Sequence, residues 1–340
     1  MGKENNLESK ILDILKKLQK MTLSEMMRFD VRDYEFRRVV AEALKSKEKS
    51  DALAANFEEY ENPSNNIVVK TAIGKKWAQS RMLDFDYDAS LFANCVYLLA
   101  MFPNKAPSSM DRIPKKKNEY RFTFDGENYY RGDTMNSWAT TLNAFFDDVK
   151  RYRDFLAPGF FETHLLPEYI TEFMTIVYTI GNFFPLPWGL NTPRSKSAQD
   201  YWDLALLAIY QHYKKTEDEA YEPEFKKCIL EWVFGTEGTE NEETCIKWLL
   251  SFNGWNHFVE QNFLQDFVHG DKENGGYGRP KELWKGHFEN QANKPSGEQF
   301  SEFFTNASTW ILARGARIAP EVKKQLENRD LYDLARQMAG

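Results

Sequence analysis

The sequence predicts a mainly α protein of about a dozen packed helices with one β-hairpin near the middle. Two observations support this fold class. Apolar residues recur at helical spacing through most of the 340 residues, beginning with Leu7, Ile11 and Leu15. In contrast, only the stretch 120–131 alternates aromatic with polar residues, on either side of Asp125-Gly126, the dipeptide typical of a tight hairpin turn.

The helical patterns follow one another along the chain, and Asp133 or Thr134 is expected to cap the helix that follows the hairpin. A Pro-rich and then basic stretch at 102–117 separates an N-terminal helical region, 1–102, from a main region, 118–340, unless the two form one continuous domain. Helices are expected over 7–21, 34–45, 51–60, 71–82, 89–101, 133–155, 167–180, 197–213, 223–234, 242–252, 255–268, 281–288, 299–314 and 320–338.

Charge and hydropathy limit the classes of partner. The net charge of −7 and the pI of about 5.5 argue against attraction of the whole molecule to nucleic acid, although a local basic patch could serve, and 112–117 is the obvious one. The N-terminus lacks the apolar core of a secretory signal, and the most apolar segment, 91–102, is shorter than the roughly 20 residues that span a bilayer. We therefore expect a soluble, cytoplasmic protein of bacterial type with no membrane partner.

The stretch 178–203 is the most informative part of the chain. It is expected to be a rigid loop, packed by its rings and fixed by its prolines, between two helices. These rings and prolines are Phe183, Phe184, Trp188, Pro185, Pro187 and Pro193.

An anion site is expected where this loop meets the following helix. Ser197-Ala198-Gln199-Asp200 has the form of a capping box with Asp in place of Glu, which places the helix start and its free amides at Ser197. Arg194 adds a guanidinium suited to phosphate or carboxylate, unless it only pairs with a nearby Asp and stiffens the loop. The ligand-binding candidates are Asn191, Arg194, Ser195 and Ser197.

Asp203 falls on the apolar side of a helix that is apolar almost all round, so its carboxylate requires a partner. It either accepts hydrogen bonds from a structural arginine, for which Arg194 and Arg131 are the candidates, or acts as a general base or metal ligand.

His257 and Glu260 are three residues apart on the expected helix 255–268 and fall inside its apolar arc, so both are expected to be buried. The spacing suits a hydrogen-bonded acid–base pair or two metal ligands, and equally a satisfied core pair. Because no second ligand pair has clear spacing, no metal site is assigned. The other histidines are isolated by comparison.

The segment 131–137 joins the hairpin to the next helix and is expected to form a glycine turn. Arg131 and Asn136 are secondary binding candidates, because Asn136 begins a polar stripe that faces either a cleft or solvent. No Walker loop, dinucleotide fingerprint, nucleophile elbow or kinase signature is present, so the sequence indicates no particular cofactor.

Several stretches from Arg131 onward resemble an uncharacterised family of bacterial proteins, a domain of unknown function. They read RGDTMNSW, YTIGNFFPLP with LNTPRS, DYWDLAL and ILARGARI. The resemblance implies no activity and no catalytic residue.

Two functions remain open. The first is an intracellular enzyme or ligand-binding protein that holds an anionic small molecule at 180–203, with Asp203, or His257 with Glu260, transferring a proton. The second is a non-catalytic helical interaction module, such as a partner in a toxin, defence or regulatory complex, whose aromatic loop docks a protein. Burial of the loop's rings and convergence of Arg194, Asp203 and His257 on one pocket would favour the enzyme.

Overall fold

The computed structural model describes residues 4–31, 87–116, 118–124, 128–135, 168–190, 201–223, 230–234, 240–271, 275–291 and 294–340. Of these residues 58% are helical and 14% are in strands, so the protein is mixed α/β and the expected mainly α class is wrong. The expected single hairpin is part of a four-stranded antiparallel sheet, and a two-stranded sheet lies elsewhere. Expected elements within 32–86 and 136–167, and the helix start at Ser197, lie outside the described residues.

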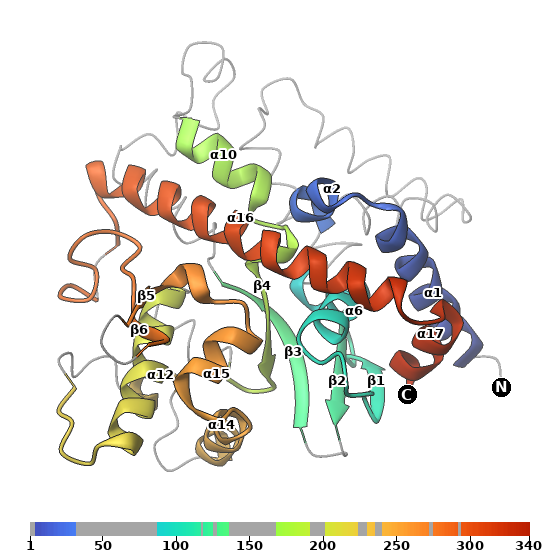
Figure 1. The fold of residues 1–340 in the computed structure, drawn as a ribbon, viewed down its shortest axis with the longest axis horizontal. Coiled ribbons are helices and arrows are strands. Elements are labelled where there is room, and N and C mark those ends of the chain that lie inside the picture. The colour runs from blue at the N-terminus through green and yellow to red at the C-terminus, as the bar shows by residue number, and fades with distance from the viewer. Residues whose placement is uncertain are drawn as a thin grey trace.

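The elements alternate between helices and short strands along the chain (Figure 1). The α-helices are α1 (Glu4–Lys20), α2 (Leu23–Arg28), α6 (Leu91–Ala100), α10 (Glu168–Ile176), α12 (Trp202–Glu217), α13 (Leu230–Phe234), α14 (Glu240–Leu250), α15 (Gly254–Gln261), α16 (Glu298–Glu327) and α17 (Leu331–Ala339). Short 3₁₀ turns are η1 (Tyr87–Ala89), η2 (Ile180–Asn182) and η4 (Gln265–Phe267). The strands are β1 (Ser109–Arg112), β2 (Tyr120–Phe124), β3 (Asn128–Thr134), β4 (Phe183–Pro187), β5 (Val268–Gly270) and β6 (Tyr277–Pro280).

The larger sheet has the order β1-β2-β3-β4, and its centre is the hairpin that the sequence predicts. The expected rigid loop contributes β4, whose Phe183 pairs with Thr134 and whose Pro187 pairs with Tyr130. Prolines obscured this strand because they cannot donate to a ladder, but an edge strand tolerates them where the N–H would face away from the sheet. Phe183 and Phe184 are fully buried, whereas the next ring, Trp188, is 41% exposed.

The expected turn and N-cap after the hairpin are also wrong. β3 continues through Gly132, Asp133 and Thr134, each of which pairs with a residue of β4. Glycine is required at 132 by packing, because a Cβ there would lie 1.6 Å from the Asp88 carbonyl oxygen. The sheet therefore approaches the backbone of η1 more closely than any side chain would allow.

Helix α16 organises the packing. Figure 1 shows it crossing the molecule, with α10 and α2 above it and the sheet below, and it contacts α6, η2 and α1 as well. The sequence predicts two helices here, but α16 runs unbroken through Pro320, since apolar positions from Phe300 to Val322 keep it buried along its length. At its C-terminal side α17 packs on α1, so the two chain ends lie together at one edge.

Arg314 of α16 is a buried cation at the centre of this packing. Its Nη1 donates to the carbonyls of Gly181 and Phe183 at 2.8 and 2.7 Å, and its Nε donates to the carbonyl of Asn262 at 3.0 Å. Burial lowers the pKa of Arg314 to about 9. The guanidinium thus joins α16 to η2, β4 and the end of α15.

Two further expectations fail for local reasons. The expected helix 281–288 is a series of turns. The expected helix 255–268 ends at Gln261, where Phe263 adopts a φ of 57°. The amides of Phe263 and Leu264 bond to the carbonyls of Glu260 and Val259, the pattern of a Schellman cap. Such caps usually carry glycine, so Phe263 is not recognisable as a stop signal from the sequence.

Candidate functional site

Asp203 lies in the first turn of α12, which begins at Trp202 with Tyr201 as its N-cap residue. Its side chain is buried, with the residue only 2% exposed, as its place on an apolar helix predicts. Oδ1 accepts a hydrogen bond from the Leu204 amide at 2.9 Å. The partial positive charge at a helix N-terminus favours a carboxylate at this position.

The partner of Asp203 is His287, which lies 84 residues away in the turn region before α16. Asp203 Oδ2 lies 2.6 Å from His287 Nδ1 and also accepts from the Leu283 amide at 2.9 Å. Because a carboxylate only accepts hydrogen bonds, Nδ1 carries the proton. We call these two residues the Asp203–His287 pair.

Aromatic rings enclose the imidazole of His287. The Trp284 ring stacks on it with centroids 3.5 Å apart, and Tyr201 meets it edge-on at 5.1 Å. His287 is fully buried, and its Nε2 has no hydrogen-bond partner within the described part of the chain. The ring is therefore fixed in position and tautomer, and its Nε2 accepts no hydrogen bond from the residues that the structure describes.

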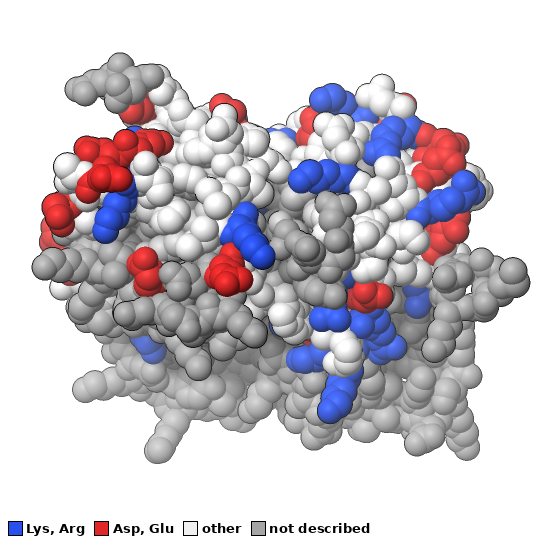
Figure 2. Space-filling model, turned by 90° about the horizontal axis from the view of Figure 1, so that it is seen from below, with Lys and Arg blue, Asp and Glu red and all other residues white. Residues whose placement is uncertain are grey.

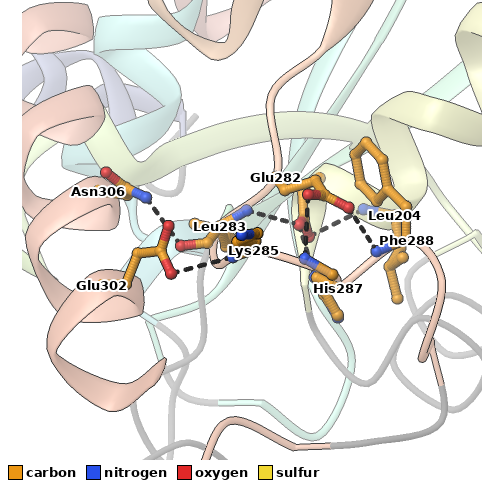
Figure 3. A network of polar contacts seen from close by, with 10 residues as sticks. Leu204, Glu282, Leu283, Lys285, His287, Phe288, Glu302 and Asn306 are labelled. Carbon is orange, nitrogen blue, oxygen red and sulfur yellow. Dashed lines mark hydrogen bonds and ion pairs between the residues drawn. The ribbon is translucent and has the colours of Figure 1, made fainter. Parts of the chain in front are cut away.

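Acidic and amide side chains hold the backbone around His287 (Figure 3). Glu282 accepts from the amides of Gly286 and Phe288 at 3.2 and 2.9 Å. From α16, Glu302 accepts from the Lys285 amide at 3.0 Å, and Asn306 donates to the Leu283 carbonyl at 3.0 Å. These bonds take the place of regular secondary structure in positioning the turn region.

The chemistry open to this arrangement is proton transfer. A carboxylate that accepts from Nδ1–H orients the imidazole and stabilises the imidazolium that forms when Nε2 takes a proton. Burial strengthens that electrostatic effect, because few water molecules compete with the pair. A purely structural pair would contain the same hydrogen bond from His287 Nδ1 to Asp203. The feature that favours a reactive site is therefore the Nε2 without a partner among the described residues.

The expected burial of His257 and Glu260 is wrong, because both are exposed on α15. His257 Nδ1 accepts from the Asn253 amide at 2.8 Å. The wheel that placed the two residues inside an apolar arc relied on Phe263 and Phe267, which lie beyond the helix end. Both side chains line a surface cavity of about 450 Å³ with Lys105, and Asp203 is not among the lining residues.

Arg131 is not the partner of Asp203. Its Nη2 lies 2.9 Å from Oε2 of Glu119, a buried carboxylate at the start of β2. Asp203, Arg131 and His257 therefore do not meet in one site, since each bonds to a different partner. The other binding candidates, Asn136, Asn191, Arg194, Ser195 and Ser197, lie outside the described residues.

No sequence signal pointed to His287. It stands in a stretch that reads as a helix, and its partner is chosen by tertiary packing. Among the described residues, no group of three or more His, Cys, Asp or Glu side chains is placed to hold a metal ion. Within the same residues no helix is both long and apolar enough to cross a membrane.

Comparisons with protein-family models, with curated proteins and with solved structures found no match to this chain. The function is therefore argued from the site alone.

Proposed function

We propose that this protein is an intracellular enzyme that binds an anionic small molecule and uses His287 as general base and acid. Asp203 orients the imidazole and stabilises its charged form. The observation that carries the proposal is the 2.6 Å bond from Nδ1 to Asp203 together with an Nε2 that has no partner within the described residues. His287 takes the place of His257 and Glu260, which the sequence offered as one of two candidate groups for proton transfer.

The anion site is part of the proposal because of its place in the chain. The segment 191–200 ends directly at Tyr201, whose ring meets His287 edge-on at 5.1 Å. Arg194 and Ser197 precede Tyr201 by only a few residues, and a guanidinium with a hydroxyl suits a phosphate or carboxylate.

A ligand screen followed by a turnover assay tests the proposal. Thermal shift against nucleotides, sugar phosphates and divalent metals identifies compounds that stabilise the native state. Arg194→Ala is expected to abolish the shift by anionic compounds. His287→Gln is expected to keep the shift and lower turnover of that compound by about 10²- to 10⁴-fold, the usual contribution of a general base.

His257→Gln is the matched control, because it removes an exposed histidine of α15. It should leave both binding and turnover unchanged. Equal turnover by His287→Gln and the wild-type protein would refute the catalytic role, and an undiminished shift in Arg194→Ala would refute the anion site.

A further inference from the structure

The basic stretch of the sequence lies near the exposed ring of Trp188, since Lys116 and Arg131 share the Glu119 carboxylate and Arg131 lies over that ring. In the sheet, Arg121 of β2 and Arg131 of β3 are neighbours, since Phe122 pairs with Tyr130. Their guanidinium carbons lie 5.5 and 5.9 Å from the centroid of the Trp188 ring. Trp188 follows β4 directly and is 41% exposed, so part of its ring faces solvent between cations.

Further cations surround this group. Arg112 at the end of β1 and Lys115 in the β1–β2 connection are exposed, and Lys116 of the same connection is half-buried. Seen from below, Lys and Arg side chains gather on the part of the molecule where Figure 1 places β1 to β3 (Figure 2). We call Arg112, Lys115, Lys116, Arg121, Arg131 and Trp188 the Trp188 patch.

The cations of the patch are positioned by bonds. The buried Glu119 carboxylate lies 2.9 Å from Arg131 Nη2 and 3.6 Å from Lys116 Nζ. Arg112 Nε donates to the Lys116 carbonyl at 3.1 Å and so closes the connection between the strands. With Asp111 exposed on β1, the described patch carries five cations and two carboxylates, and one carboxylate is buried. The described residues of the patch are thus net positive on a chain of net charge −7.

We propose that the Trp188 patch binds single-stranded nucleic acid. An exposed indole offers a flat surface on which an unpaired base stacks, and guanidiniums beside it bind phosphate and stack as well. The patch lies on a sheet, which supplies a rigid platform, and its charge is complementary to a phosphate backbone. Binding rests on stacking and phosphate contacts and is expected to show little sequence preference.

Fluorescence anisotropy with a short labelled oligothymidylate or oligouridylate and the full-length protein tests the proposal. Trp188→Ala is expected to weaken binding by about 5- to 150-fold, the range for loss of one stacked base. Affinity should fall as salt rises from about 50 to 200 mM, and Lys115→Gln should reduce the logarithmic salt slope by about 0.7. Arms with DNA and RNA show whether the 2′-hydroxyl contributes.

Tyr332→Ala is the matched control, because Tyr332 is also an exposed ring with a lysine, Lys16, over it at 5.4 Å. It lies in the first turn of α17, contributes neither a cation nor a ring to the patch, and should leave binding unchanged. Absence of binding at low salt would overturn the proposal. The proposal would also be overturned if Trp188→Ala and the wild-type protein bound the oligonucleotide equally well and heparin competed equally with both. That result would indicate a general polyanion surface. If Trp188→Ala fails to fold, Lys115→Gln and Arg112→Gln at exposed sites give the same decision through the salt slope.

Discussion

Replacing Asp203 is expected to destabilise the protein strongly, whatever reaction it performs. The Asp203→Ala substitution leaves the Leu283 amide and His287 Nδ1 buried without their acceptor, and it also removes the bond from Leu204. Each buried unsatisfied donor costs about 1–3 kcal/mol, and two such donors remain in this variant. We expect a loss of about 3–5 kcal/mol in the free energy of unfolding.

The Asp203→Asn substitution tests the tautomer of His287 with a smaller loss in the free energy of unfolding. The Leu283 amide and His287 Nδ1 both bond to Oδ2, whereas the Leu204 amide bonds to Oδ1. With its NH2 group at the Oδ2 position, the asparagine donates to His287 Nδ1 and keeps the Leu204 bond but leaves the Leu283 amide without an acceptor, an expected loss of about 1–3 kcal/mol. The proton of the imidazole is then expected to move to Nε2, which removes the basic nitrogen. Chemical denaturation measures the first effect, and ¹⁵N spectra of the histidine side chains measure the second.

The control is Asp266→Ala. Asp266 Oδ2 lies 2.7 Å from Arg317 Nε, but both side chains are partly exposed, and such pairs contribute about 0.2–1 kcal/mol. If Asp203→Ala destabilises the protein no more than Asp266→Ala does, the Asp203–His287 pair does not stabilise the core as proposed. If His287 in Asp203→Asn keeps its proton on Nδ1, the argument on tautomer is wrong.

Two further predictions concern the core. Gly132→Ala should destabilise by about 3 kcal/mol or more, because its Cβ would lie 1.6 Å from the Asp88 carbonyl oxygen. Gly270→Ala, with nothing within 4 Å, should change unfolding little, and equal losses would contradict the packing argument. Burial raises the pKa of the Cys245 thiol from 9.0 to about 12. The unfolded chain therefore loses this proton first, and stability falls by about 1.4 kcal/mol per pH unit as pH rises from 9 toward 12. Cys245→Ala should flatten the curve of unfolding free energy against pH in that window, and an unchanged slope would refute the assignment.

The sequence predicted the elements whose signal is local. Helices α1 and α6 follow from apolar spacing, and the β2-β3 hairpin follows from Asp125-Gly126 between aromatic strands. β1 and β4 were missed because strands of four or five residues beside prolines read as loops. β1 pairs with β2, and β4 pairs with β3. This pairing is not visible in a short stretch of sequence that covers β1 or β4 alone.

The candidate site was predictable only in part. A carboxylate on an apolar helix had to be paired, and Asp203 is buried and paired as that reasoning requires. Its partner could not be found, because His287 is 84 residues away and is positioned by Trp284, Glu282 and the neighbouring α16. His257 and Glu260 were misplaced because Phe263 ends α15 with a backbone conformation that is rare for an aromatic residue.

The prolines of β4 also bear on solubility. A free strand edge lined with aromatic and aliphatic side chains is a template for association with other chains. Pro185 and Pro187 remove two amide donors from this edge, since proline has no N–H to offer an incoming strand. The sheet is thus closed to growth on the side of its most apolar strand. Because all five residues of β4 are buried, this edge is exposed only before the strand is covered, and the missing donors then limit pairing with another chain during folding.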